Sequence, residues 1–301
     1  MRQPRRFEPL PLGSPDQPFS KGLMARALIA VGVRPVRAHE LARRMDGDLG
    51  RRGADRIEVE RFEEIMLETL GEEEGGDALR RLRRSEQLQE LELPILLLVG
   101  GTTGTGKSTV ATEAAYRLGV TRVTSTDFVR QTLRAFFSPD FMPTVHYSSF
   151  EAWRGLREPE SAEDPIVAGF LEQTRHVMVG VRASIERALE EGWSMVLEGV
   201  HLVPGMVDVD RSGAIVVQCV IAIEDEDLHR SHFWVRDYAT EGLRPLERYI
   251  DAMPEIRLIQ ASLIERARRC DVPVIMNATL DQAMGEVLDL VLSTADRLAR
   301  V

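Results

Sequence analysis

A glycine-rich turn between an apolar run and a helical pattern constrains this sequence more than any other feature. Residues 95–99 are all aliphatic, and residues 101–108 read Gly-Thr-Thr-Gly-Thr-Gly-Lys-Ser. This matches G-x-x-x-x-G-K-[ST], a phosphate loop whose backbone N–H groups and following helix face phosphate oxygens. A turn can match by chance, but the strand before and the helix after are the context that the motif requires. The segment therefore predicts a nucleotide site.

Two residues of this loop carry side chains with direct roles in the motif. The ammonium group of Lys107 would reach the β- and γ-phosphates of a nucleotide, and the hydroxyl group of Ser108 would coordinate Mg²⁺. ATP and Mg²⁺ are therefore the expected cosubstrate and cofactor. The loop residues expected to bind ATP are Gly101, Thr103, Gly104, Thr105, Gly106, Lys107, Ser108 and Thr109.

Composition and charge exclude several classes of protein. Hydrophobic residues make up 44% and charged residues 29% of the chain, as in folded proteins. A net charge of −10 argues against a protein that coats nucleic acid. No apolar run approaches the ~20 residues of a membrane span, and the first residues lack a signal core. We therefore expect a cytoplasmic protein with no nucleic-acid or membrane partner, in which Cys219 is an inert core thiol.

Three stretches at the front of the chain predict a small helical domain. Apolar residues recur at helical spacing over residues 19–31, 35–45 and 59–70. Before them, residues 1–18 hold five prolines, which favours a loose arm or one short edge strand. The front of the chain therefore folds as helices rather than as part of a sheet.

Part of this front region resembles the ATP-cone, a small nucleotide-binding regulatory module. The words that carry the likeness are Pro18-Phe19-Ser20-Lys21-Gly22-Leu23 and Ala38-His39-Glu40-Leu41-Ala42. ATP-cones usually carry a β-hairpin before their helices, and the proline-rich arm departs from that pattern. The region is expected to be either a regulatory nucleotide site or a structural cap.

A change of composition separates the front region from the rest. Residues 72–76 are acidic and contain two glycines, which predicts a hinge, and the arginine-rich stretch after them predicts a charged surface helix ending near Pro94. The expected division is an ATP-cone-like helical domain at 1–71, a linker or charged helix at 72–93, and a main domain with the phosphate loop at 94–301, which includes a lid around 225–250.

The main domain shows an alternation of strands and helices. Four strands are predicted beyond the first, and long helical patterns separate them. Continuous β-branched strands that alternate with helices indicate a parallel sheet covered on both faces, in which ligands gather at the carboxyl ends of the strands. The four further strands are expected at residues 122–125, 194–197, 214–221 and 273–276.

A carboxylate and a guanidinium group follow the second strand, one helical turn apart. Asp127 could accept the proton of an attacking hydroxyl group or help to place the substrate. Arg130 could hold an anionic group through two parallel hydrogen bonds. The alternative is an aspartate that caps the helix, with an exposed arginine three residues later.

A second carboxylate follows the third strand. Glu198 could hold the water shell of Mg²⁺ or orient the nucleophile, which makes it both a catalytic and a metal-site candidate. Gly199 would leave room for the substrate beside it. His201 could contact a substrate phosphate, and the alternative is a structural histidine that is hydrogen-bonded within the turn.

The segment after the fourth strand carries several arginines. Such residues suit a lid that closes over the transferred phosphoryl group and excludes water. Arg236 is expected to stabilise developing charge, whereas Arg230 and Arg244 are expected to bind the substrate. The alternative is an ordinary amphipathic helix with solvated arginines.

Taken in order, these segments resemble the 2-phosphoglycerate kinases, a family of P-loop kinases, over nearly the whole chain. The phosphate loop alone is shared by many families, whereas the sequence segments that begin at His146 and Glu198 are found in fewer families and are more specific. The matching words run from Gly100 to Ser108, Thr126 to Arg130, His146 to Trp153 and Glu198 to Gly205, with His232-Phe233 and Arg236.

The resemblance implies a fold and a reaction. The fold is α/β, an adenylate-kinase-like P-loop kinase with a parallel five-stranded sheet flanked by helices, plus a small N-terminal helical domain. The reaction is transfer of the ATP γ-phosphoryl group to the 3-hydroxyl of 2-phosphoglycerate, giving 2,3-bisphosphoglycerate. Asn277 is expected beside the adenine by analogy. The residues that could bind the phosphorylated substrate are Arg130, His146, Tyr147, Ser148, His201, Arg230 and Arg244.

Two other functions are compatible with the sequence. A family likeness can outlast a change of acceptor, so a kinase for another small hydroxylated metabolite is one alternative. An ATP-binding regulatory protein that hydrolyses ATP slowly or not at all is the other. A homo-oligomer is compatible with either function.

Overall fold

The structure, a computed structural model, describes residues 11–13, 18–91, 93–209, 213–239 and 246–299. The arm expected at residues 1–18 lies mostly outside the described residues. The chain divides into two compact units. The first comprises Met1–Glu92, Ala114–Val120 and Met284–Val301, and the second comprises Leu93–Glu113 and Thr121–Ala283.

The helical part of the first unit contains the three helices predicted at the front of the chain. They are α1 (Lys21–Ala30), α2 (Pro35–Arg52) and α3 (Val59–Leu70). Proline stands at the first position of α2, where its missing N–H group costs nothing, and Gly53 ends that helix in the left-handed conformation. A common apolar core holds the helices together, and its largest fully buried members are Met24, Leu28, Leu41, Met45, Phe62, Ile65 and Met66.

A fourth helix, α4 (Glu72–Glu90), replaces the hinge that was expected at residues 72–76. Three glutamates occupy its first turn, where carboxylates interact favourably with the helix dipole. A Cβ atom at Gly75 would lie 3.2 Å from the carbonyl oxygen of Met66, so this glycine permits close packing against α3. Arg81 of α4 donates two hydrogen bonds of 2.8 Å to Asp289 of α11 (Leu280–Ala299).

All five strands of the second unit lie at the predicted positions. They are β1 (Ile95–Gly100), β2 (Val123–Ser125), β3 (Met195–Glu198), β4 (Ile215–Ala222) and β5 (Val274–Met276). The sheet is parallel throughout, with the order β2-β3-β1-β4-β5. Because parallel strands end at one edge, the segments after β1, β2 and β3 meet there. This α/β sheet is the fold that a P-loop kinase requires.

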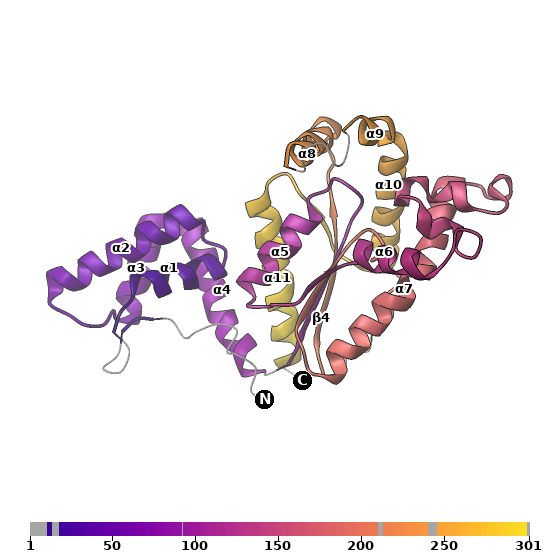
Figure 1. Ribbon diagram of the computed structural model, residues 1–301. Helices are drawn as coiled ribbons and strands as arrows, with labels where there is room; N and C mark the ends of the chain where they lie inside the picture. The colour runs from indigo at the N-terminus through magenta and orange to yellow at the C-terminus, as the bar shows by residue number, and fades with distance from the viewer. Residues whose placement is uncertain (1–10, 14–17, 92, 210–212, 240–245, 300–301) are drawn as a thin grey trace. The chain divides into compact units, whose positions relative to one another are not determined.

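Helices bury one face of the sheet. Leu96 and Leu98 of β1 pack against Val177 and Val181 of α7 (Pro165–Glu190). A second helix, α10 (Met253–Arg269), lies on the same side of the sheet as α7 (Figure 1). It packs against Val220 of β4 through a set of aliphatic side chains. The thiol of Cys219 is buried and free, and burial raises its pKa to about 12, as expected for an inert core thiol.

The remaining elements are α5 (Lys107–Arg117), α6 (Thr126–Phe136), η1 (Pro143–His146), η2 (Ser149–Gly155), η3 (Pro159–Ser161), α8 (Glu226–Ala239) and α9 (Leu246–Asp251). None of the described helices combines the length and apolar character of a membrane span.

Candidate active site

The predicted phosphate loop joins β1 to α5 and has the expected turn. The hydroxyl group of Thr105 donates a 3.0 Å hydrogen bond to the carbonyl oxygen of Thr102, and both residues are buried. Gly104 has φ +87°, and a Cβ atom there would lie 2.5 Å from the ring of Phe233. Both the backbone conformation and the space therefore require glycine at this position.

Three side chains hold the loop from outside through its carbonyl groups. Asn277 donates a 2.9 Å hydrogen bond to the carbonyl oxygen of Thr105. His229 donates one of 2.8 Å to that of Thr103, and His232 donates one of 2.9 Å to that of Gly104. With three successive carbonyl groups engaged from outside, the N–H groups of the loop are left for phosphate oxygens.

This arrangement adds two residues to those predicted and gives a loop contact to a third. His229 and His232 were not assigned functions, although their spacing of three residues on one helix placed both on the same face. Asn277, expected beside the adenine, is buried and donates to the loop. Loop support by these three side chains is thus a property of the folded structure.

Ser108, in the first turn of α5, lies beside Glu198, the last residue of β3. The register pairs Val99 with Glu198, so the end of β3 reaches the start of the loop. The hydroxyl group of Ser108 donates a 3.0 Å hydrogen bond to a carboxylate oxygen of Glu198. Two adjacent oxygen donors fit Mg²⁺, which keeps several waters and binds through one or two protein ligands and substrate phosphates. Among the described residues, no group of three or more His, Cys, Asp or Glu side chains forms a metal cage.

The start of α6 presents Asp127 to the site. Ser125, not Asp127, caps the helix, because its hydroxyl group accepts a 3.1 Å hydrogen bond from the N–H group of Asp127. The carboxylate is 53% exposed and accepts a 2.9 Å hydrogen bond from Nε of Arg130. The alternative of a capping aspartate with an exposed arginine was therefore wrong, and Asp127 is available to a substrate.

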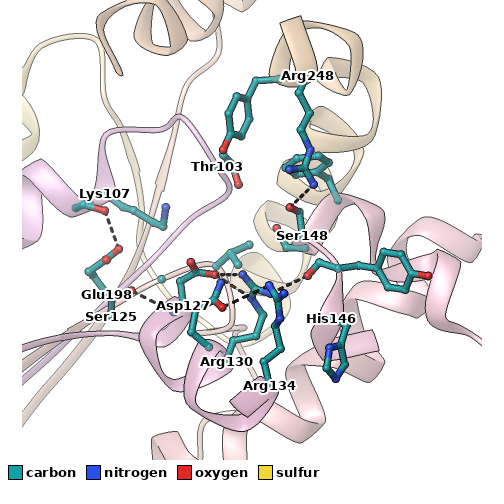
Figure 2. Close-up of a pocket in the computed structure, with 18 residues that line it drawn as sticks. Thr103, Lys107, Ser125, Asp127, Arg130, Arg134, His146, Ser148, Glu198 and Arg248 are labelled. Carbon is teal, nitrogen blue, oxygen red and sulfur yellow. Dashed lines mark hydrogen bonds and ion pairs between the residues drawn. The ribbon is translucent and has the colours of Figure 1, made fainter. Parts of the chain in front are cut away.

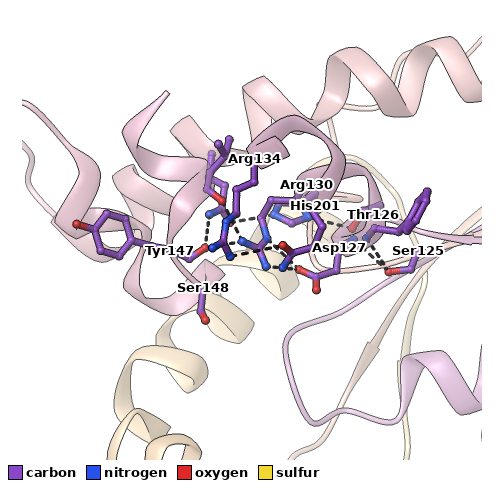
Figure 3. Close-up of polar contacts among 12 residues, drawn as sticks. Ser125, Thr126, Asp127, Arg130, Arg134, Tyr147, Ser148 and His201 are labelled. Carbon is purple, nitrogen blue, oxygen red and sulfur yellow. Dashed lines mark hydrogen bonds and ion pairs between the residues drawn. The ribbon is translucent and has the colours of Figure 1, made fainter. Parts of the chain in front are cut away.

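Arg130 is buried and holds the segment that follows α6. Its Nη1 atom donates hydrogen bonds of 2.9 Å to the carbonyl oxygens of Val145 and Tyr147 (Figure 3). The guanidinium group thus fixes both the Asp127 carboxylate and the backbone around η1. Its side chain lines the cavity, but most of its donors are already used by the protein.

His201 lies outside the cavity, which corrects the prediction that it contacts the substrate. The ring is fully buried: Nδ1 accepts a 2.9 Å hydrogen bond from the hydroxyl group of Thr126, and Nε2 donates one of 2.9 Å to Gln173. A Cβ atom at Gly199, where φ is +149°, would lie 1.9 Å from the Thr126 hydroxyl oxygen. The space beside Gly199 therefore belongs to this hydrogen-bonded network. Burial, assisted by the charge of Arg130, lowers the pKa of His201 to about 3.

The depressed pKa of His201 predicts an acid-sensitive fold. The unfolded chain protonates this histidine below about pH 6.5, whereas the folded protein keeps it neutral to about pH 3. Stability that is complete above pH 6.5 is therefore lost as the pH falls below that value, by at most about 1.4 kcal/mol per pH unit. Denaturant titrations from pH 7 to about pH 5 should show a shallower decline for His201→Gln than for the wild type. The exposed His39→Gln variant is the control, and equal slopes for His201→Gln and wild type would contradict this role.

Three further predicted substrate residues, His146, Tyr147 and Ser148, line the cavity, although the ring of Tyr147 points away from Asp127 (Figure 3). The Nε2 atom of His146 donates a 2.9 Å hydrogen bond to the carbonyl oxygen of Phe137.

The lid arginines are placed differently from one another. Arg230 pairs with Glu226 on its own helix and does not line the cavity, so it is not brought to the site. Arg236 belongs to α8, but its side chain and the whole of Arg244 lie outside the described residues. Arg248 of α9 lines the cavity and donates a 3.0 Å hydrogen bond to the hydroxyl group of Ser148.

These residues surround one cavity of about 540 Å³ at the carboxyl edge of the sheet. Lys107 and Glu198 lie at one side of the view in Figure 2, and Arg134, His146, Ser148 and Arg248 lie at the other. The charged and hydroxyl-bearing residues that line it are Thr103, Lys107, Ser108, Ser125, Asp127, Arg130, Arg134, His146, Tyr147, Ser148, Ser149, Glu198, Arg248 and Tyr249. The cavity therefore combines a phosphate loop with a second, arginine-bearing wall.

Comparison with known proteins identifies the family. No family model matches the chain. The 2-phosphoglycerate kinase of Methanopyrus kandleri is 36% identical over 279 residues, which cover 92% of this chain and 85% of that protein. The 2-phosphoglycerate kinase of Pyrococcus furiosus is 36% identical over 272 residues, which cover 90% of this chain and 88% of that protein. The 2-phosphoglycerate kinase of Methanothermobacter thermautotrophicus is 35% identical over 274 residues, which cover 90% of this chain and 89% of that protein. With this identity over nearly the full length of both partners, the chain belongs to the 2-phosphoglycerate kinase family.

Proposed function

We propose that this protein transfers the γ-phosphoryl group of ATP to the 3-hydroxyl group of 2-phosphoglycerate, giving 2,3-bisphosphoglycerate and ADP. The observation that carries the proposal is a single cavity in which the phosphate loop faces Asp127 and an arginine-bearing wall. Membership of the 2-phosphoglycerate kinase family supports the identity of the acceptor.

The donor end of the cavity is built by the phosphate loop. Lys107 lines the cavity, and its Nζ atom donates a long hydrogen bond of 3.5 Å to the carbonyl oxygen of Thr102. No carboxylate among the described residues pairs with it, which leaves the ammonium group for the γ-phosphate. Ser108 and Glu198 would hold Mg²⁺ directly or through its waters. Mg²⁺ bound there supplies positive charge to the phosphates of ATP.

The acceptor hydroxyl group is activated from the opposite side. As the acceptor oxygen forms its bond to the γ-phosphorus and the bond to the ADP oxygen breaks, the hydroxyl proton passes to the Asp127 carboxylate. Arg130 donates to that carboxylate and fixes its direction. Phosphoryl transfer depends chiefly on such positioning and on charge stabilisation.

The lid completes the site in this proposal. Tyr249 of α9 stacks on Phe233 of α8 with ring centroids 5.1 Å apart, which joins the two lid helices. His232 connects α8 to the loop, and Arg236 follows it by one helical turn. We infer that Arg236 and Arg244 supply further positive charge when the lid closes over the phosphates.

An assay with several acceptors tests the reaction. Purified protein and Mg-ATP should release ADP with 2-phosphoglycerate, but not with glycerate or without an acceptor. Turnover with an unrelated hydroxylated metabolite alone would instead show a different kinase. Stoichiometric ATP binding without acceptor-dependent ADP would show a regulatory protein.

The regulatory nucleotide site expected in the helical unit stays a prediction. A cavity of about 260 Å³ in that unit is lined by Glu73, Glu74 and Asp77, together with Arg81. Arg81 is already paired with Asp289. Because carboxylates repel phosphates, this cavity does not favour nucleotide binding, and the alternative of a structural cap gains support.

A further inference from the structure

The cationic side chains that line the active-site cavity differ in how far the protein already uses them. Arg130 donates to Asp127 and to two backbone carbonyl groups. Arg248 donates to Ser148 and pairs with the carboxylate of Glu151. Arg134 contacts only the neutral side-chain oxygen of Gln131, over 3.4 Å. Within the described part of the chain, Arg134 and Lys107 are therefore the lining cations that lack a carboxylate partner.

Arg134 lies on the face of α6 that lines the cavity. Asp127, Arg130, Gln131 and Arg134 follow one another at intervals that put them on one side, and all four line the cavity. At a rise of 1.5 Å per residue, the backbone of Arg134 lies roughly 10 Å beyond that of Asp127 along the helix. The same face thus carries the proposed base at one end and an uncommitted guanidinium group at the other.

We propose that Arg134 is the residue that binds the anionic end of the acceptor. The inference rests on the proposed function. The two uncommitted cations match the two anionic partners of the reaction: Lys107 faces the γ-phosphate, and Arg134 faces the acceptor's own phosphate or carboxylate. The guanidinium fork binds either group through two parallel hydrogen bonds. With the acceptor hydroxyl group at Asp127, its charged end points along α6 towards Arg134.

Arg248 is placed to complete this anion site. It lies on α9, and its bonds to Ser148 and Glu151 join the lid to the segment that follows α6. Figure 2 shows the bond to Ser148. Its charge is already balanced by Glu151, so Arg134 supplies the larger share of uncompensated attraction. Binding of the acceptor's anionic end therefore depends chiefly on one exposed residue in the last turn of α6.

Steady-state kinetics of Arg134 variants test this assignment. Arg134→Ala should raise KM for 2-phosphoglycerate by about ten- to a hundredfold, as expected for loss of a charge-assisted bidentate contact. KM for ATP and kcat at saturating acceptor should stay near wild-type values, and Arg134→Lys should lie in between because lysine keeps the charge but not the fork. Arg175→Ala is the matched control, because Arg175 is exposed on α7 and pairs with Glu172 away from the cavity. An unchanged KM for 2-phosphoglycerate in Arg134→Ala would overturn the proposal.

Equilibrium binding of 2-phosphoglycerate separates this inference from the proposed reaction. Arg134-dependent binding without turnover would refute the reaction and support the anion site. Turnover by the wild type, together with unchanged binding of 2-phosphoglycerate in Arg134→Ala, would support the reaction and refute the anion site. A wild-type protein that neither binds nor phosphorylates 2-phosphoglycerate would refute the reaction and the anion site. Binding of glycerate, which lacks the phosphate, distinguishes the two anionic groups. If Arg134→Ala loses affinity equally for glycerate and 2-phosphoglycerate, Arg134 binds the carboxylate. If it loses affinity for 2-phosphoglycerate alone, Arg134 binds the phosphate.

Discussion

Replacement of Lys107 by alanine should lower kcat by about a hundred- to a thousandfold, the loss typical when one preorganised charge-stabilising group is removed. The side chain lines the cavity and lacks a carboxylate partner among the described residues, so its charge is available to the transferred phosphoryl group. Among the described residues, the hydrogen bond of its Nζ atom to the carbonyl oxygen of Thr102 is 3.5 Å long, and the fold should survive its loss. Acceptor-dependent ADP release, measured at saturating ATP, is the test.

The composition of the chain offers a matched control for this variant. Lysine occurs only at positions 21 and 107. Lys21 pairs with Asp46 in the helical unit, so Lys21→Ala removes the same side chain away from the cavity. That control should keep its turnover. If Lys107→Ala retained most of the wild-type kcat while Lys21→Ala did not, the assigned role of the loop lysine would be refuted.

Replacement of Asp127 by asparagine should lower kcat by about a hundred- to ten-thousandfold, the range for loss of a positioned general base. The amide oxygen can still accept the hydrogen bond from Arg130, so the helix and the η1 segment should keep their positions. KM for either substrate should change little, because the loss falls on the step in which the hydroxyl proton is removed.

A second variant makes this prediction specific. Asp140→Asn changes an exposed aspartate outside the cavity and should behave as the wild type. Turnover above half the wild-type value in Asp127→Asn would mean that transfer needs no base and that Asp127 only holds Arg130.

Local pattern was sufficient to locate the strands and the phosphate loop. The apolar runs before Gly101 and Glu198 form neighbouring buried strands, so their ends meet as expected of a parallel sheet. The order of the strands depends on long-range pairing and could not be derived from periodicity. Gly75 shows a related limit, because the composition around it suggested a hinge, whereas close packing against α3 explains the glycine.

Some of the site residues were predictable because they follow the end of a strand. Lys107, Asp127 and Glu198 do so and line one cavity. His146, Tyr147 and Ser148 also line it, and the family resemblance indicated them. His201 also follows a strand, but Thr126 and Gln173 enclose it, and nothing nearby in the sequence announces that burial.

The same limit applies to the arginines of α6. Arg130 and Arg134 are equivalent in local pattern. The carbonyl groups of Val145 and Tyr147, which lie 15 and 17 residues beyond Arg130, occupy one guanidinium group and leave the other available. Which arginine meets the substrate is therefore decided by tertiary structure.

Phosphorus NMR of the reaction mixture tests the central claim most directly. With Mg-ATP and 2-phosphoglycerate, the γ-phosphate signal of ATP should disappear as ADP and a second phosphomonoester signal, coupled to the protons of carbon 3, appear in equal amounts. Lys107→Ala should leave the starting spectrum nearly unchanged over the same time. Release of inorganic phosphate alone, or no new phosphoester with active wild-type protein, would contradict the assignment of 2-phosphoglycerate as the acceptor.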